Sequence, residues 1–271
     1  MVADGWGYRF SMTTNTNNTL TFVTCTNSLK VLSKHLLASP CLQDDGHALA
    51  VYFNAPSAAH GFNSAAAAAA AAPNPKSKIP WLVWVHQDVY LPHGWDIDFS
   101  ESLSEALLRF PKLAVAGLYG ISGTGTNARR AGHVLDRGTP LHEPEPLPCL
   151  VDSLDELLFA VRVDVGLQLD PALGFDFYAT DLVLQAQARG LQCAVVDAYC
   201  EHWSGTASTG VSLAVAKRIL TSGEAFELKW QQHLPVTTPC FDLCQSGDVA
   251  RSLAAIMGTA EESTDSGGGD A

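Results

Sequence analysis

The segment Trp81–Pro92 constrains the fold more than any other part of the chain. It begins with the apolar residues WLVWV and then changes abruptly to His86-Gln87-Asp88. A run of this length is too short to cross a membrane, and it lacks the alternation of a strand with one face in water. We therefore expect a strand that is buried on both faces of a parallel sheet.

The polar end of this strand is a candidate binding site. Ligands of open parallel sheets bind beyond the carboxyl ends of the strands. In an extended backbone the side chains of His86 and Asp88 point to the same side, so an imidazole and a carboxylate could hold one metal ion. The simpler alternative is a polar turn after a buried strand, and position alone favours that alternative.

The remaining sequence alternates between apparent strands and helices. Apolar, β-branched segments at 19–26 and 48–53 predict two further strands, and Asn27 and Ser28 are placed to open a helix after the first of them. The other predicted elements are helices at 100–109 and 180–189 and strands at 113–118 and 191–196. This βαβ alternation is typical of an α/β domain with a parallel sheet.

Four segments carry other local signals. Residues 119–148 are rich in Gly and Pro, so we expect a long irregular connection there. Ser153 and Glu156 have the spacing of a capping box for a helix or turn that continues to Arg162. Eight consecutive alanines at 65–72 predict a helix that leads into a mobile loop, and the acidic, glycine-rich stretch 261–271 predicts disorder.

Composition limits the class of protein. A chain of 271 residues that is 47% apolar suits one large α/β domain. Its net charge of -12 repels phosphate backbones, so we expect no nucleic acid partner. The sequence shows no signal peptide, no transmembrane segment and no paired cysteine spacing among its seven cysteines, which predicts a soluble, cytoplasmic protein.

Two more polar residues are candidates for function. Asp181 stands at the start of a predicted helix, where a carboxylate commonly satisfies free N–H groups. His202 follows the last predicted strand, where a histidine beside Trp203 is more often packed than a ligand. The glycines of 117–125 lack the order of a dinucleotide-binding loop, and Arg129-Arg130 is best explained as a solvated pair.

Several stretches of the chain, taken in order, point to one family. They are LTFVTCTN at 20–27, VWVHQDVYLPHGW at 83–95, VAGLYG at 115–120, GHVLDRG at 132–138, VDSLDELLFAVR at 151–162, LGFDFYATDLVLQAQARGL at 173–191 and EHWSG at 201–205. Together they resemble the family 2-like glycosyltransferases. The resemblance implies the GT-A fold, a Rossmann-like αβα sandwich with a mostly parallel central sheet.

The resemblance also suggests how the chain is organised. We expect an N-terminal extension at 1–18 and a GT-A-like domain at 19–245. Residues 64–79 form an alanine-rich insert within that domain, and a C-terminal helix and disordered tail occupy 246–271.

The same resemblance implies roles for individual residues. His86-Gln87-Asp88 looks like the counterpart of the family's DxD motif, in which Asp88 holds Mn²⁺ or Mg²⁺ and His86 replaces the first acid. His202 is similar in placement to a histidine that completes the metal site, and Asp181 to the general base. The residues assigned to the nucleotide-sugar site are Thr24, Thr26, Asn27, Asn54, Asp88 and Asp155.

These assignments predict an inverting glycosyltransferase. A metal ion at Asp88 would stabilise the charge that builds up on a departing nucleoside diphosphate, and Asp181 would take a proton from the hydroxyl of a glycan, lipid or protein acceptor. Without a second nucleophilic carboxylate, a single displacement is the better expectation. Two alternatives stay open: a non-catalytic binding or scaffold protein that retains the cleft, and a zinc hydrolase that uses the cysteines and histidines.

Overall fold

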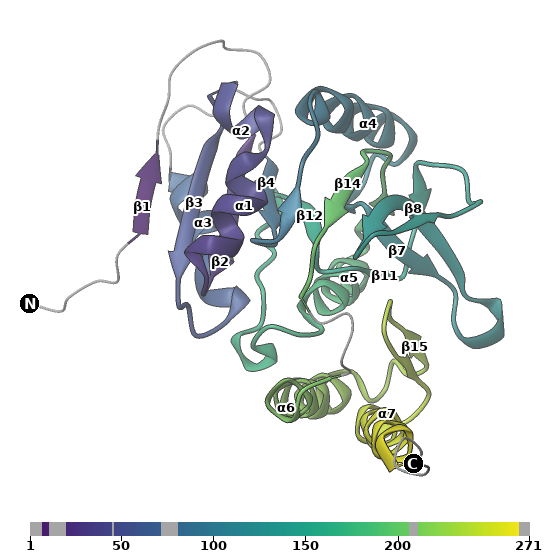
Figure 1. Ribbon diagram of the computed structural model, residues 1–271. Helices are drawn as coiled ribbons and strands as arrows, with labels where there is room; N and C mark the ends of the chain where they lie inside the picture. Colours follow the sequence, from purple (N-terminus) through teal and green to yellow (C-terminus); the bar gives the residue numbers. More distant parts are fainter. Residues whose placement is uncertain (1–6, 11–19, 45, 72–80, 206–210, 266–271) are drawn as a thin grey trace, which may run out of the picture.

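The computed structural model describes residues 7–10, 20–44, 46–71, 81–205 and 211–265. It confirms the α/β class: helices pack on both faces of a large sheet, and a smaller sheet lies beside it (Figure 1). Within the described ranges, no helix combines the length and apolar character that a membrane crossing requires.

The large sheet has eight strands and mixed directions. Their order across the sheet is β1 (Gly7–Phe10), β3 (Ala48–Phe53), β2 (Thr21–Thr26), β4 (Trp81–Val85), β12 (Leu158–Arg162), β6 (Leu113–Gly117), β13 (Gln192–Val195) and β10 (Cys149–Leu150). The pairs β3–β2, β2–β4 and β6–β13 are parallel, while β1, β12 and β10 pair antiparallel with their neighbours. The expectation of a mostly parallel sheet is therefore met only in part, because the reversed strand β12 lies at its centre.

Helices cover the two faces of this sheet as side chains alternate along each strand. Val23 and Trp84 pack on the side of α3 (Ala58–Ala71) and α5 (Tyr178–Ala188). Phe22 and Val85 pack on the opposite side with α1 (Leu29–Lys34) and α4 (Trp95–Arg109). The predicted strand at 81–85 is indeed buried on both faces, because a helical layer covers each of them.

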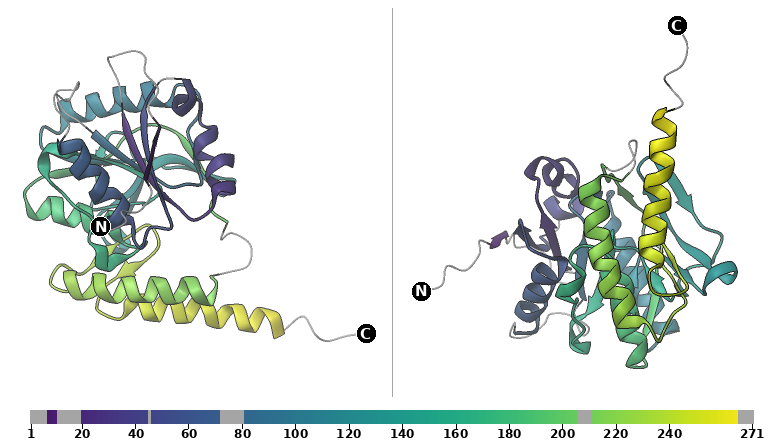
Figure 2. Two further views of the ribbon diagram at one scale, coloured as in Figure 1. Left: turned by 90° about the vertical axis from the view of Figure 1, so that its left-hand side faces the viewer. Right: turned by 90° about the horizontal axis from the view of Figure 1, so that it is seen from below.

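Two long helices add to the α5 side of the molecule. The helices α6 (Leu213–Trp230) and α7 (Asp248–Asp265) lie side by side (Figure 2). Gly223 permits their close approach, since a Cβ there would lie 2.6 Å from Val249 Cγ1. The chain between them forms the hairpin of β15 (Val236–Thr237) and β16 (Asp242–Leu243).

The segment 119–148, expected to be irregular, forms most of the second sheet. In order, the strands of this second sheet are β11 (Ser153–Leu154), β7 (Tyr119–Ser122), β8 (Arg129–Asp136), β14 (Cys200–His202) and β5 (Val89–Tyr90). Strand β9 (Thr139–His142) pairs with β8. Gly132 has φ 135°, and a Cβ there would lie 2.4 Å from the Leu118 carbonyl oxygen. The Gly and Pro content of this segment suggested a loop, but Gly132 allows the backbones of β8 and β7 to approach closely.

Local helix signals had different outcomes. Ser28 caps α1 as expected, because its Oγ accepts a hydrogen bond from the Val31 N–H at 3.3 Å. The predicted capping box at Ser153 and Glu156 is wrong: these residues form β11 and the approach to β12. The remaining short elements are α2 (Pro40–Asp44) and the 3-10 turns Leu36–Ala38, Gly125–Asn127, Val163–Val165 and Pro171–Leu173.

The predicted N-terminal extension, alanine-rich insert and C-terminal tail form helix or strand wherever the structure describes them. Gly7–Phe10, within the predicted extension, pairs with β3. The alanine run joins α3 up to Ala71, and its expected mobile loop lies outside the described residues. Residues 261–265, expected to be disordered, belong to α7, whereas 266–271 lie outside the description.

Candidate metal centre

Three side chains that the sequence assigned to a metal come together at one edge of the large sheet. His86 and Asp88 follow β4, and His202 ends β14. Each offers one ligand atom, and these atoms all lie within 4.8 Å of one another. All three residues are half-buried, so the cluster is partly accessible.

Strand pairing explains why the three residues meet. Directly after Asp88, strand β5 pairs antiparallel with β14, with Val89 opposite His202. The Trp203 N–H also donates a hydrogen bond to the Asp88 carbonyl at 2.9 Å. The register of two short strands therefore places the histidine beside the aspartate.

A second carboxylate orients His202. Nδ1 of its ring lies 2.9 Å from Asp136 Oδ1, while Nε2 lies 3.5 Å from Asp88 Oδ1. Arg137 holds Asp136 in turn, at 2.7 Å. A carboxylate on one ring nitrogen fixes the tautomer and directs the other nitrogen toward a metal. Sequence reasoning missed Asp136, because only the parallel pairing of β8 with β14 sets it opposite His202.

The ring of His86 is held by α5. Its Nε2 lies 2.7 Å from the hydroxyl of Tyr178, which also accepts a hydrogen bond from Trp84 Nε1 at 3.2 Å. Burial lowers the pKa of His86, so its neutral form is favoured. A neutral imidazole is the form that binds metals.

The other two side chains of the cluster, Asp88 and His202, form an ion pair. Burial lowers the pKa of His202, but hydrogen bonds to Asp136 and Asp88 outweigh this effect and raise it to about 10. For Asp88, burial acts in the opposite direction and raises the pKa. The hydrogen bond from His202 and the nearby imidazoles outweigh this effect and lower the pKa to about 2. A divalent cation would take the place of the proton on His202.

Polar groups predicted to bind the nucleotide lie at the ends of the neighbouring strands. The Thr26 hydroxyl donates to Gln87 Oε1, and Gln87 Nε2 donates to Asn27 Oδ1 at 3.1 Å. Gln87 thus links the end of β2 to the segment that follows β4, a role that the sequence did not reveal. Thr24 is fully buried within β2, whereas Asn54 is exposed after β3 with φ 49°.

The other two acidic residues predicted for the site, Asp155 and Asp181, differ in placement. Asp155 Oδ1 accepts a hydrogen bond from the Leu157 N–H at 2.9 Å, and its charge acts on His86 and His202. Asp181 is fully buried. Its carboxylate receives Lys229 Nζ at 2.7 Å, Trp230 Nε1 at 2.8 Å and Gln185 Nε2 at 2.7 Å.

The environment of Asp181 does not suit the proposed general base. Both of its oxygens are engaged by donors, and the side chain has no exposed surface. The alternative, that it satisfies the first N–H groups of α5, is not seen either. Its contacts to Lys229 and Trp230 instead join α5 to α6, which is a structural role.

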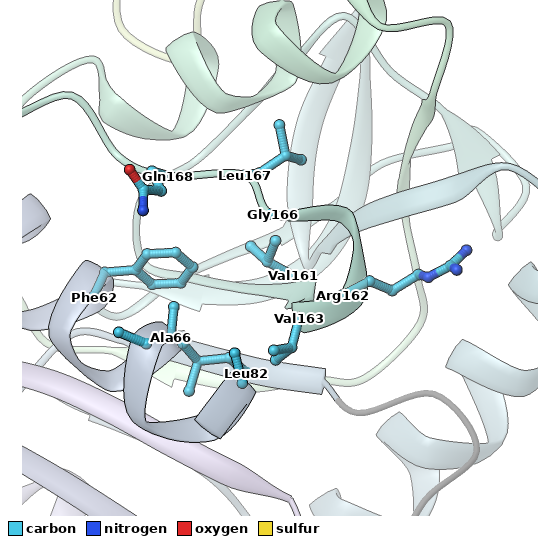
Figure 3. A pocket seen from close by; sticks show the side chains of 11 residues that line it. Phe62, Ala66, Leu82, Val161, Arg162, Val163, Gly166, Leu167 and Gln168 are labelled. Carbon is cyan, nitrogen blue, oxygen red and sulfur yellow. The ribbon is translucent and has the colours of Figure 1, made fainter. Parts of the chain in front are cut away.

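An apolar cavity of about 110 Å³ lies at the opposite end of β4 (Figure 3). It is lined by Phe62, Ala66, Ala67, Ala70, Leu82, Val161, Arg162, Val163, Gly166, Leu167 and Gln168. Arg162 points away from the apolar side chains in Figure 3, and Asp164 and the Leu113 carbonyl bind its guanidinium group. Among the described residues that line the cavity, Arg162 is therefore already engaged and is not free to bind a nucleotide.

The cysteines form no comparable cluster within the described residues. Cys193 and Cys200 are buried, and burial raises the pKa of both thiols. Cys240 and Cys244 are exposed, and neither belongs to a group of metal-ligating side chains found in the described ranges. The zinc hydrolase alternative therefore gains no ligand set from the geometry.

Comparisons with known proteins leave the family open. No protein-family profile matches the chain. The sequence is 31% identical, over 141 residues or 48% of the chain, to "ATP synthase subunits region ORF 6" of Fuscovulum blasticum, and it spans only 53% of that relative. The match to the solved structure of A197 from STIV covers 66% of this chain and 82% of the A197 chain, with 10% sequence identity and a TM-score of 0.40. This likeness is too weak to support a fold family.

Proposed function

We propose that the protein is a metal-dependent inverting glycosyltransferase with a GT-A fold. It would move a sugar from a nucleoside-diphosphate sugar to a hydroxyl group of a glycan, lipid or protein. The observation that carries the proposal is the convergence of His86, Asp88 and His202 beyond the end of β4.

The direction of the strands supports a nucleotide site beside this cluster. Strands β3, β2 and β4 are parallel, so the residues that follow them emerge at one edge of the sheet. Gln87 is hydrogen bonded to both Thr26 and Asn27 at that edge. Edges of this kind, where parallel strands end, are where α/β proteins bind nucleotides.

The donor set supports the chemistry of a Lewis acid. Sugar transfer builds negative charge on the departing diphosphate, and a divalent cation there would stabilise that charge. Three protein ligands leave coordination positions for phosphate oxygens. Because two of the ligands are imidazoles, a first-row transition ion such as Mn²⁺ is favoured over Mg²⁺.

Calorimetric titration with UDP, GDP and their sugar conjugates tests the proposal. With Mn²⁺ present, wild type should bind at least one of them, and Asp88→Asn should lose the metal-dependent part of that binding. Asp98→Asn, on the exposed face of α4, is the matched control and should bind as wild type does. Binding that is independent of Mn²⁺ and unchanged in Asp88→Asn would refute the proposal, as would no binding to any nucleotide.

A non-catalytic binding protein is the second candidate. The burial of Asp181 in contacts with α6 favours it, because the residue expected to act as the base has no exposed surface. This candidate predicts metal-dependent nucleotide binding without release of the nucleoside diphosphate. We further propose a cytoplasmic location, which the seven free cysteines support because thiols persist in a reducing compartment.

A further inference from the structure

An exposed tryptophan follows the metal cluster directly. Trp203 comes immediately after His202, and its backbone N–H donates a hydrogen bond to the Asp88 carbonyl at 2.9 Å. The residue is 40% exposed, whereas the other four tryptophans of the described ranges are buried or half-buried. Tryptophan is strongly buried on average, so an indole left in solvent beside a candidate site indicates a binding surface.

The indole of Trp203 is held in place on two sides. Its Nε1 donates a hydrogen bond to Glu201 Oε2 at 3.1 Å. Its ring stacks on the imidazole of His35, with 6.1 Å between the ring centroids and 22° between the ring planes. Both neighbours are half-buried. A side chain that is already ordered loses little conformational entropy when a ligand binds, so Trp203 is preorganised for stacking.

The stacked pair lies within electrostatic range of the metal cluster. Burial lowers the pKa of His35, while the carboxylates of Asp88 and Glu201 act on this ring in the opposite direction. Gln87 joins the segment after β4 to the predicted nucleotide edge, and the next residue, Asp88, joins it to Trp203. A ligand on Trp203 would therefore lie beside the same cation as the nucleotide but on a different surface.

A ring that carries hydroxyl groups fits the chemistry of this surface. A sugar ring presents C–H groups that pack on an aromatic face, and its rim presents hydroxyl groups that donate hydrogen bonds. Among the described residues, the side-chain hydrogen bond of Glu201 engages Oε2, so Oε1 is available as an acceptor at the edge of the indole. An aromatic face with a few placed polar groups is the usual composition of a small-molecule site.

The carboxylates disfavour the other ligand classes. Glu201 lies beside the indole in a chain of net charge -12, so a phosphate or an anionic headgroup would be repelled from this surface. An acyl chain would cover the indole but would leave the Glu201 carboxylate without a hydrogen-bond donor. A neutral saccharide satisfies both groups at once.

We propose that Trp203 and Glu201 form the acceptor subsite, and that the acceptor is a neutral saccharide whose ring lies on the Trp203 indole. This inference rests on the proposed function and narrows its acceptor from glycan, lipid or protein to a sugar. Both residues bind the acceptor, and their position beside Asp88 brings its hydroxyl groups toward a donor held by the cation.

Tryptophan fluorescence is the first arm of the test, because Trp203 is the most exposed tryptophan of the described ranges. The protein, without added Mn²⁺, is titrated with the methyl glycosides of glucose, galactose, mannose and N-acetylglucosamine. At least one of them should shift the emission of wild type to shorter wavelength, and Trp203→Phe should not show this shift.

Calorimetric titration with the same glycoside is the second arm. Trp203→Ala should weaken binding by about 10-fold or more, whereas Trp203→Phe, which keeps an aromatic face, should weaken it by less than about 3-fold. Glu201→Gln keeps one acceptor oxygen but loses the charge, and it should weaken binding by about 3- to 10-fold. Leu108→Ala, at a residue 85% exposed on α4, is the control and should bind as wild type does.

Two results would overturn the subsite. One is that no glycoside binds, or that binding is the same in Trp203→Ala as in wild type. The other is that UMP or GMP, and not a glycoside, shifts the emission of Trp203, which would make the indole a platform for the nucleobase of the donor.

Failure of the inference and failure of the proposed function are distinguishable. Binding of the glycoside needs no cation, so Asp88→Asn should retain it while losing Mn²⁺-dependent binding of the donor. If wild type binds a donor with Mn²⁺ but no glycoside depends on Trp203, the subsite is overturned and the proposed function stands. If wild type binds no sugar nucleotide with Mn²⁺, the proposed function fails, and the acceptor role of Trp203 falls with it.

Discussion

Two carboxyl groups near the start of α5 have opposite surroundings. Asp181, in the first turn of α5, is fully buried and receives Lys229, Trp230 and Gln185. Glu156 lies beside Tyr178, the first residue of the same helix, and its Oε1 has no partner among the described residues. A carboxylate that is fully hydrogen bonded stabilises the fold, whereas a buried carboxyl oxygen without a donor costs stability.

The largest effect on stability should come from Asp181→Ala. This change leaves Lys229 and the Trp230 N–H without their buried partner, so we expect the free energy of unfolding to fall by roughly 3 kcal/mol. Urea denaturation measures it. An Asp181→Ala protein as stable as wild type but without transferase activity would reverse the comparison and restore Asp181 as the base.

The next effect concerns the orientation of His202. Asp136→Asn removes the carboxylate that binds its Nδ1 at 2.9 Å, and we expect Mn²⁺ affinity to fall by about 10- to 100-fold. The measurement is a Mn²⁺ titration, and Asp98→Asn is again the control. Unchanged affinity in Asp136→Asn would show that this contact does not support the metal site.

A smaller effect distinguishes the two partners of Lys229. Asp170 lies 2.7 Å from Lys229 Nζ but is partly exposed. Burial raises the pKa of Asp170, and the hydrogen bonds from Lys229 and the Ala172 N–H outweigh this effect and lower it. A lowered folded pKa gives stability that is present above the unfolded pKa and is lost as the pH falls through the folded one.

Asp170→Asn should therefore destabilise the protein at pH 7 by less than about 1 kcal/mol, and less still in acid, where wild type has lost the same contribution. Thermal unfolding between pH 2.5 and pH 7 provides the measurement. A cost as large as that of Asp181→Ala would mean that Lys229 depends on both carboxylates equally.

The sequence predicted what depends on local pattern. The apolar run before His86 indicated a strand buried on both faces, and Ser28 and Gly190 marked the start of α1 and the end of α5. These signals act over a few residues, through side-chain burial, a cap or a positive φ, as at Gly190 with φ 69°.

The rest of the site arises from pairing between distant segments. Asp136 meets His202 only because β8 pairs with β14, and Glu156 meets Trp84 only because β12 pairs with β4. Ser153 and Glu156 carry the spacing of a helix cap, but strand pairing overrode that local signal. Periodicity along one chain contains no information about such partners.

The most direct test of the account is a Mn²⁺ titration followed by electron paramagnetic resonance, with and without nucleoside diphosphate. The account predicts one Mn²⁺ per chain, tighter binding when UDP or GDP is added, and loss of the site in Asp88→Asn but not in Asp98→Asn. Absence of stoichiometric Mn²⁺ binding, or binding that survives Asp88→Asn, would contradict the central claim that His86, Asp88 and His202 form a metal site for a nucleotide.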